Sequence, residues 1–277
     1  MAEITDLCLA GGASRGVCYL GALKKLEEVG ILKIKKIVGT SIGALIGLSF
    51  ILGFSVEELL DIIIQKNTHE FFDFSLYEDG AIVKGEKLRL WIHDILKQKM
   101  EIDTTFEKLY EKTGVDFVTT GICIGGSGDF EEGLQIFSKE TTPDMPLLTA
   151  IYATMAFPYI FPPVEYKSCK FIDGGLLSNF PMDLIDSEKG LGITTNSRSV
   201  KTDTIFESPG TYTNKLYQLI SAHISKFQKL EDNNNIINIV CNDFDLINFK
   251  QTIDDKITLY MRGYNDTQKY LRKTYDL

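Results

Sequence analysis

The sequence lacks a long hydrophobic run and a recognisable export signal. Its longest nearly unbroken apolar stretch, residues 42–54, is thirteen residues long, short of the roughly 18 to 20 needed to cross a bilayer. Residues 1–6 include acidic side chains and no basic segment, unlike a secretory signal peptide. We therefore expect a cytoplasmic protein whose contact with membranes is at most peripheral.

Cysteine, histidine and positive charge are also scarce. The five cysteines are an odd number and no two are spaced as CxxC, so free thiols in a reducing compartment are expected, without a disulfide framework or zinc site. Lys and Arg number 29 against 38 Asp and Glu, which gives a net charge of −9. Because phosphate neutralisation needs clustered basic residues, nucleic acid is not an expected partner.

What remains is the composition of an ordinary globular protein, with 44% apolar and 24% charged residues in 277. The chain has no repeat and no linker, so one α/β domain over residues 1–277 is expected. It opens with two strand–turn–helix units: a strand over residues 7–10 with a helix from Gly16 to Gly30, then a strand at 37–38 with a helix from Ile42. Two strands joined by a helix indicate a parallel pair.

Hydrophobic patterns predict further elements along the chain. Segment 69–84 has no clear period, so we expect a loop there. Its aromatic residues are expected in the core, with an interfacial patch as the alternative; they are Phe71, Phe72, Phe74 and Tyr77. Helices are predicted over 56–66, 86–99, 105–113, 147–155, 215–230 and 254–273, and strands over 117–124, 134–137, 170–173, 191–194 and 236–240. The apolar strands suit a sheet covered on both faces, a three-layer α/β sandwich with a mainly parallel sheet.

The strongest local motif is the GxSxG pentapeptide Gly39–Gly43. A strand precedes it and an apolar helix follows it, which is the setting of a nucleophile elbow. There the hydroxyl of Ser41 would be exposed on a sharp turn, and the flanking glycines avoid Cβ clashes. The N–H groups at the start of the helix would stabilise negative charge nearby.

A second glycine-rich turn, Gly11–Gly16, also lies between a strand and a helix. A dinucleotide-binding GxGxxG motif is broken by Ala13, and no Lys-Ser or Lys-Thr pair follows for a P-loop. Two interpretations remain, a simple tight turn and a nest of N–H groups that holds an oxyanion. Because this turn and the Ser41 turn end neighbouring strands at one edge of the sheet, the oxyanion interpretation is favoured.

A serine nucleophile needs a base, and the sequence offers few histidines for it. His93 and His223 lie inside predicted helices, and His69 in the ambiguous aromatic segment is a weak alternative. Asp173 ends a predicted strand at a Gly-Gly turn. A desolvated carboxylate there would have a raised pKa and could accept the serine proton, although Asp-Gly-Gly by itself also describes a plain turn.

These three motifs, in this order, resemble those of the patatin-like phospholipase family, which pairs a GGGxRG loop with GxSxG and a later DG[GA] aspartate. The blocks at 153–158, 161–163 and 179–181 also match, so the resemblance spans residues 6 to about 196. Two departures are Ala13 for the third loop glycine and Thr154 for a serine. Residues 197–277 match nothing recognisable and are expected to complete the fold and influence substrate access.

The resemblance implies a patatin-like fold and a lipid acyl hydrolase with a Ser41–Asp173 dyad and an acyl-enzyme intermediate. It implies no metal or other cofactor, a lipid substrate and transient contact with a membrane or micelle. Arg15 would support the oxyanion or bind a lipid phosphate. The oxyanion would be held around Gly11, Gly12, Ala13 and Ile42.

Two other hypotheses stay open at this point. Ala13 and the unmatched C-terminal third are compatible with a non-catalytic module that binds lipid or protein on the same fold, although Ser41 and Asp173 are intact. A nucleotide-dependent oxidoreductase is the least favoured, because residues 34–36 offer no acidic residue for a ribose.

Overall fold

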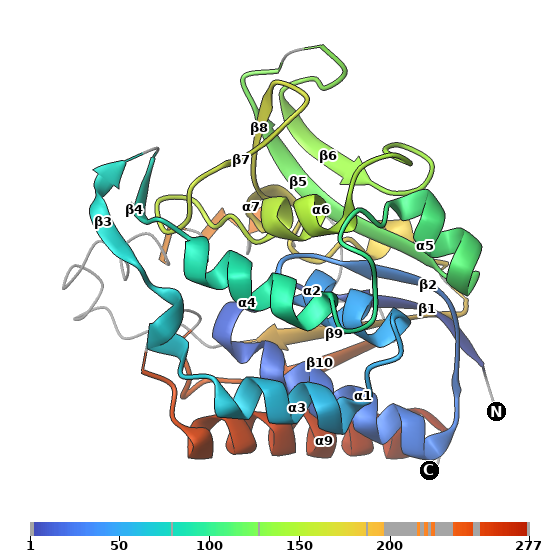
Figure 1. Ribbon diagram of the computed structural model, residues 1–277. Coiled ribbons are helices and arrows are strands. Elements are labelled where there is room, and N and C mark those ends of the chain that lie inside the picture. The colour runs from blue at the N-terminus through green and yellow to red at the C-terminus, as the bar shows by residue number, and fades with distance from the viewer. Residues whose placement is uncertain are drawn as a thin grey trace.

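The computed structural model describes residues 3–78, 80–126, 128–186, 188–196, 215–216, 219–220, 223–224, 235–245 and 250–275. Its centre is an eight-stranded sheet (Figure 1). Neighbouring strands run parallel in the order β10–β9–β1–β2–β5. These strands are β1 (Ile4–Leu9), β2 (Leu32–Gly39), β5 (Asp116–Ile124), β9 (Gly190–Asn196) and β10 (Ile236–Val240). The predicted α/β class with a mainly parallel central sheet is confirmed.

The far end of the sheet is antiparallel and is organised around β5. Its strands are β6 (Gly133–Phe137), β7 (Val164–Tyr166) and β8 (Cys169–Asp173). Along β5, residues 116–119 pair with β2, residues 121–124 pair with β8, and residues 119–123 pair with β6. Strand β6 pairs with some of the same β5 residues as β2 and β8 do, so β6 must lie on the opposite edge of β5 from both of them. Strands β2 and β8 therefore meet end to end along the opposite edge.

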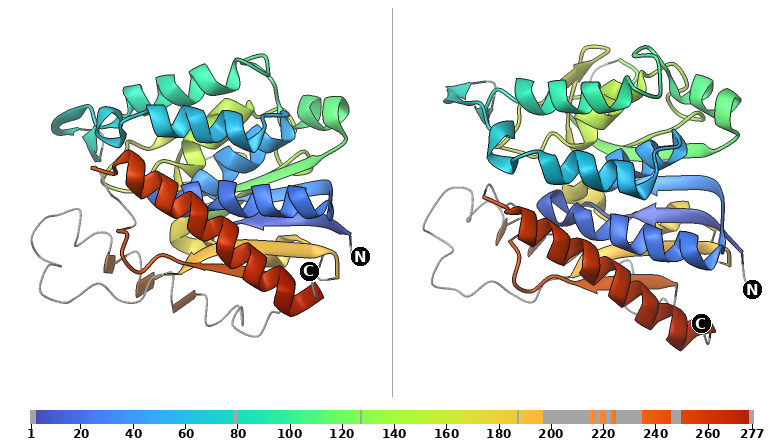
Figure 2. Two further views of the ribbon diagram at one scale, coloured as in Figure 1. Left: turned by 90° about the horizontal axis from the view of Figure 1, so that it is seen from below. Right: turned by 60° about the horizontal axis from the view of Figure 1, so that its bottom comes forward.

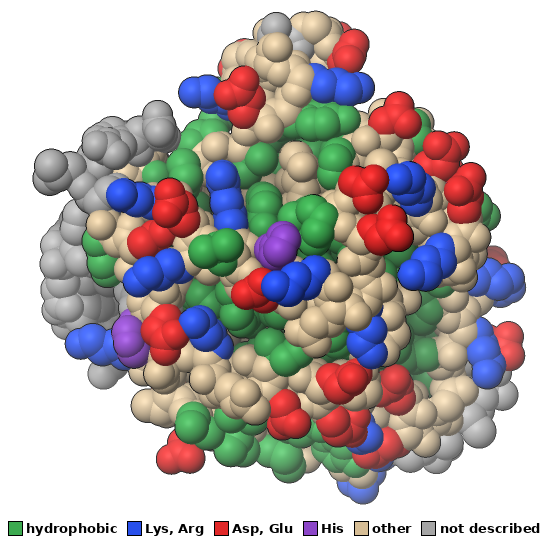
Figure 3. Space-filling view, in the orientation of Figure 1, with side chains coloured by type: hydrophobic (Ala, Val, Ile, Leu, Met, Phe, Trp, Pro, Cys, Tyr) green, Lys and Arg blue, Asp and Glu red, His purple; other side chains and the backbone are tan. Residues whose placement is uncertain are grey.

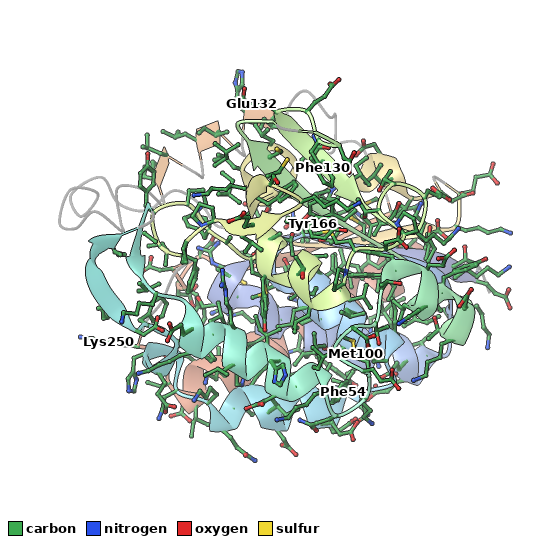
Figure 4. All side chains as sticks on the ribbon, turned by 45° about the horizontal axis from the view of Figure 1, so that its top comes forward. Phe54, Met100, Phe130, Glu132, Tyr166 and Lys250 are labelled. Atoms are coloured by element: carbon green, nitrogen blue, oxygen red, sulfur yellow. The ribbon has the colours of Figure 1, made fainter. Side chains whose placement is uncertain are left out.

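Aromatic rings hold this antiparallel end together. The ring of Phe171 on β8 packs edge-on against Phe130 and Phe137, with centroid distances of 5.0 and 5.3 Å. Phe130 also lies 6.1 Å from the ring of Tyr166, and both are labelled in Figure 4. Since aromatic side chains bury a large apolar area, these contacts fix where β8 ends.

Three helices, α1 (Val17–Val29), α3 (Val56–Gln65) and α9 (Ile253–Tyr275), pack side by side (Figure 2). Helices α1 and α9 approach so closely that a Cβ on Gly21 would lie 1.9 Å from the Tyr260 oxygen, and one on Gly263 would lie 1.8 Å from the Cys18 oxygen. Only glycine fits these two positions. The C-terminal helix is thereby held directly on the helix that follows the first glycine-rich turn.

Most predicted elements are present, with shifted ends. The predicted helices correspond to α1, α3 and α9, together with α2 (Ile42–Ile51), α4 (Glu86–Leu96), α5 (Phe106–Thr113) and α6 (Leu147–Thr154). Short helical turns add η1 (Ala13–Gly16), η2 (Thr68–Phe71), η3 (Met182–Leu184) and α7 (Gly175–Ser178). The predicted helix over 215–230 lies largely outside the described residues. Among the helices described, none is long and apolar enough to span a bilayer.

Segment 69–84 differs from the expected loop. It contains η2 and a hairpin of β3 (Phe74–Glu78) and β4 (Ala81–Val83). The expectation of a core location is wrong for Phe74, whose exposed fraction is 68%, while Phe71 and Phe72 are half-buried and line a cavity. The side chain of Tyr77 lies outside the described residues. The hairpin pairs irregularly, which explains why no period-2 pattern marks it.

Replacing Gly263 by Ala is expected to destabilise the protein by about 1–3 kcal/mol, because the added methyl meets the α1 backbone. The sign is informative, since helix propensity alone would favour Ala over Gly by about 1 kcal/mol. Chemical denaturation measures the free energy of unfolding. Asn265→Ala, at an exposed position on the same helix, is the control and should leave that free energy nearly unchanged. Equal stability of Gly263→Ala and wild type would contradict the close packing.

Candidate active site

Ser41 sits on a strained turn between β2 and α2. Its backbone has φ 53° and ψ −125°, a conformation that non-glycine residues rarely adopt. The motif glycines make room for the turn: a Cβ on Gly39 would lie 2.6 Å from the Ala44 backbone, and one on Gly43 would lie 2.4 Å from the Leu9 oxygen. The serine therefore carries the strain itself, and the glycines permit the close packing around it.

Thr154, at the end of α6, supports this turn. The Ser41 backbone N–H donates a hydrogen bond of 3.0 Å to Thr154 Oγ1, and the threonine side chain is fully buried. From the sequence, Thr154 was noted only because it stands where the family pattern has a serine. Either hydroxyl residue supplies the acceptor that the turn needs.

Asp173 ends β8 and faces the same turn. Its carboxylate accepts a hydrogen bond of 2.8 Å from the backbone N–H of Gly175, and the Ser41 side chain lies near enough to lower its pKa. The Asp173 side chain is only 2% exposed. Burial raises the pKa of Asp173 to about 7, although the Gly175 N–H and the Ser41 side chain oppose the shift. The structure thus brings the two predicted side chains together in the wall of one cavity.

The glycine-rich turn lies beside Ser41. A Cβ on Gly11 would lie 3.5 Å from Ser41 Cβ and 2.3 Å from Asn179 Oδ1. The Gly11 N–H donates to the Asn179 carbonyl at 3.0 Å, and Asn179 Nδ2 donates to the Gly11 carbonyl at 3.2 Å. The Gly11 amide is therefore already engaged. Asn179 was not among the predicted site residues, although the Asn-Phe-Pro block that follows the aspartate marks its position.

Three other backbone amides belong to the two turns that hold Ser41 and the glycines. Within the described part of the chain, no acceptor is recorded for the N–H groups of Gly12, Ala13 and Ile42. Ala13 takes φ 43°, in the region that glycine adopts most readily, and both Ala13 and Ile42 line the cavity that contains Ser41. Alanine at the third loop position is therefore accommodated at a cost in backbone strain.

Arg15 was expected to support the oxyanion or to bind a lipid phosphate, but its observed contact is a different one. Its buried guanidinium donates to the Phe244 carbonyl through Nε at 2.9 Å and Nη2 at 2.6 Å, and Arg15 is not among the residues that line the cavity. Ser14 Oγ donates to the Asp245 carbonyl at 3.2 Å, and Gln251 Nε2 donates to the Ser14 carbonyl at 3.0 Å. The C-terminal segment therefore holds the glycine-rich turn in place.

A cavity of about 160 Å³ contains both Ser41 and Asp173 in its wall. None of the histidines that the structure describes lines it; His93 instead contacts Asp94, with 3.3 Å between Nδ1 and Oδ1. The remaining wall is mostly apolar and comprises Ala13, Ser14, Val17, Ile42, Ile63, Lys66, Phe71, Phe72, Leu88, Trp91, Met155, Phe157, Ile160, Phe161, Gln251 and Lys256. An apolar chain fits this lining, with a polar group beside Ser41 and Asp173.

Comparison with known proteins shows which family this chain resembles. A family model described as patatin-like phospholipase matches residues 7–186. A probable lipid hydrolase, 463L, of Invertebrate iridescent virus 6 is 30% identical over 185 residues, which are 64% of this chain and 62% of that one. An uncharacterized protein of Bacillus subtilis (strain 168), YqhO, is 25% identical over 97% of this chain and 98% of its own.

The fold is also found among solved structures. VipD from Legionella pneumophila matches with a TM-score of 0.62 at 14% identity, over 98% of this chain and 67% of that chain. At this identity the likeness concerns the fold alone. The chain spans just under two thirds of the length of the viral relative.

The support given by Thr154 is testable. Thr154→Val keeps the shape of the side chain but leaves the partly buried Ser41 N–H without an acceptor, so the free energy of unfolding should fall by about 1–3 kcal/mol. Thr154→Ser keeps the hydroxyl and is the matched control, with a smaller loss from the missing methyl. Denaturant titration compares the three proteins. A valine variant as stable as the serine variant would show that the hydrogen bond contributes nothing.

Proposed function

Since the chain belongs to the patatin-like phospholipase family, whose members are lipid hydrolases, we propose that it cleaves carboxylic esters of lipids with Ser41 as nucleophile and Asp173 as base. The observation that carries the proposal is the placement of Ser41 and the buried carboxyl of Asp173 in the wall of one mostly apolar cavity, where the Ser41 side chain lowers the pKa of that carboxyl. A serine activated by an adjacent base is the usual arrangement for acyl transfer. The whole reaction proceeds without a metal or other cofactor.

In the first step, Ser41 Oγ attacks the ester carbonyl and its proton passes to Asp173. The tetrahedral intermediate collapses when the C–O bond to the alcohol breaks, and Asp173 returns the proton to the leaving oxygen. Water then attacks the acyl-enzyme, with Asp173 again taking and returning a proton, and the fatty acid is released. The raised pKa of Asp173 suits this role, because a base whose pKa is near the working pH transfers protons efficiently.

Negative charge on the intermediate needs donors that are already in place. The amides of Gly12, Ala13 and Ile42 are the candidates, because they lack other acceptors within the described residues. Gly11 is not a candidate donor, because its N–H already donates to the Asn179 carbonyl. Its small size instead leaves room beside Ser41. One donor of this kind typically lowers the barrier by about 3 kcal/mol.

The same proposal includes access from a membrane or micelle surface. The β3–β4 hairpin is joined to residues 159–160 by backbone hydrogen bonds, and these elements expose Phe74 and Tyr159. Exposed aromatic side chains suit insertion at a lipid surface. Phe71, Phe72 and Phe161, which flank this exposed pair, line the cavity itself.

A fluorophosphonate probe should label the wild-type protein at Ser41. Ser41→Ala is expected to abolish labelling and hydrolysis, and Asp173→Asn is expected to lower both rates by at least about 100-fold because the base is lost. Ser49→Ala, on the α2 helix that follows Ser41 and outside the cavity wall, is the matched control and should label normally. Labelling that persists in Ser41→Ala would refute the assignment of the nucleophile.

The pH dependence tests the base separately. The carboxylate form of Asp173 is the active one, so kcat/KM for a water-soluble short-chain ester should rise with pH and level off above about pH 7. Below that value it should fall about tenfold per pH unit. An aspartate with an ordinary pKa near 3.9 would instead give a flat profile from pH 5 upwards, and that result would contradict the role of burial.

A further inference from the structure

Two buried cysteines meet behind the glycine-rich turn. Cys18 is the second residue of α1, which follows that turn, and Cys241 directly follows β10. Their Sγ atoms lie 3.4 Å apart, although the two residues are 223 positions apart in the chain. Both are free thiols and both are fully buried. The reaction proposed above uses neither of them.

The contact between these sulfurs is close to the geometry of a disulfide. Bonded sulfurs lie about 2.05 Å apart, so the two Sγ atoms would have to approach by about 1.4 Å. Helix α9 packs on both α1 and β10 (Figure 2), which holds the two elements that carry the cysteines next to each other. A movement of this size is within the reach of side-chain rotation.

The surroundings of the pair favour the thiolate of Cys241. Its contact with Cys18 lowers the pKa of Cys241 and raises that of Cys18. Burial opposes the lowering, the charges of Arg15 and Arg262 reinforce it, and the charge of Asp266 again opposes it. On the surface shown in Figure 3, by comparison, lysines and arginines lie beside acidic side chains. Because the thiolate is the nucleophilic form of cysteine, Cys241 is the sulfur that reacts first.

The chain next to Cys241 reaches the surface at once. Asn242 and Asp243 are both exposed. The Arg262 guanidinium holds this short loop, because it pairs with Asp243 and donates to the Val240 carbonyl at 3.1 Å. Exposed loops open locally at a small cost in free energy, so a molecule as small as hydrogen peroxide can reach Cys241 when this loop opens.

We propose that Cys18 and Cys241 form a reversible thiol–disulfide site that responds to peroxide and, when oxidised, locks the C-terminal segment onto the glycine-rich turn. The Cys241 thiolate attacks one oxygen of hydrogen peroxide, the O–O bond breaks, and hydroxide leaves a sulfenic acid on Cys241. The Cys18 thiol gives its proton to that hydroxide. Its sulfur then attacks the sulfenic sulfur, so the S–O bond breaks and the S–S bond forms. Two thiols and one peroxide thus give one disulfide and two waters, and a dithiol reductant reverses the reaction while it is oxidised itself.

The disulfide would reinforce contacts that are otherwise non-covalent. The Phe244 carbonyl, three residues after Cys241, accepts hydrogen bonds of 2.9 and 2.6 Å from Arg15 in the glycine-rich turn. These bonds join the same two segments that the cysteines would join. A cross-link between residues far apart in the chain restricts the unfolded state strongly, so the oxidised protein should unfold at a higher temperature.

A second pair of buried cysteines provides a comparison within the same molecule. Burial raises the pKa of Cys123 on β5, and Cys169 on β8 lies near enough to raise it further. The charge of Glu132 acts in the same direction. This pair therefore combines proximity with an environment that disfavours the thiolate, so it should react more slowly with peroxide.

Peptide mapping tests the site in the wild-type protein. Reduced protein is treated with a few equivalents of hydrogen peroxide, the remaining thiols are blocked with N-ethylmaleimide, and the unreduced digest is analysed by mass spectrometry. Trypsin places each of the five cysteines in a separate peptide, so every pairing can be identified. The Cys18–Cys241 cross-link should be at least about tenfold more abundant than Cys123–Cys169 and should disappear with dithiothreitol. Its absence, or a predominance of Cys123–Cys169, would overturn the proposal.

Variants separate the attacking sulfur from the resolving one. In Cys18→Ala the sulfenic acid on Cys241 has no partner, and dimedone should trap it. In Cys241→Ala, Cys18 should stay unlabelled, and equal labelling in the two variants would contradict the assignment of the nucleophile. Cys123→Ala is the matched control and should keep the Cys18–Cys241 cross-link. The mapping of the wild-type protein decides the proposal even if a variant fails to fold.

Thermal unfolding tests the locking role. Oxidation should raise the midpoint by about 5 °C or more, and dithiothreitol should reverse the shift. Cys241→Ala should show no shift. An unchanged or lower midpoint in protein that carries the mapped cross-link would refute the lock. None of these measurements involves ester hydrolysis, so their outcome is independent of the hydrolase proposal.

Discussion

The site depends on two strands that share one edge of β5. Strand β2 ends at Gly39, opposite Thr119, and antiparallel β8 arrives from the other direction and ends at Asp173, opposite Gly121. Two residues along a strand span about 7 Å, so the turn after β2 and the end of β8 necessarily face each other. This pairing brings together a hydroxyl and a carboxylate that are more than a hundred residues apart in the chain.

Holding these groups together has a cost that neighbouring elements offset. Ser41 has an unfavourable backbone conformation, and Asp173 is a carboxylate withdrawn from water. The fully buried Thr154 accepts a hydrogen bond from the Ser41 N–H. Asn179 accepts one hydrogen bond from the Gly11 N–H and donates another to the Gly11 carbonyl. These bonds come from a helix and a turn that are distant in sequence.

The described C-terminal residues pack against the region of the family match, which ends at residue 186: β10 pairs with β9, and α9 packs on α1. The Phe244 carbonyl accepts hydrogen bonds from Arg15, and Gln251 donates one to the Ser14 carbonyl. Lys256, on α9, lines the cavity. The glycine contacts between α1 and α9 hold this segment against the first glycine-rich turn. The wall of the cavity is therefore built in part from residues beyond the family match.

The sequence alone determined the α/β class, the parallel β1–β2 pair and the three turns that carry Ser41, Asp173 and the glycines, because each has a local signal: a short apolar run, a glycine turn and a helical period. Only the tertiary structure decided that the Gly11 amide binds Asn179 and that Arg15 binds the C-terminal segment. It also decided that the 69–84 segment contains a hairpin with an exposed Phe74. The partners of Gly11 and Arg15 lie more than 160 residues away, and the irregular register of the hairpin leaves no periodicity to detect.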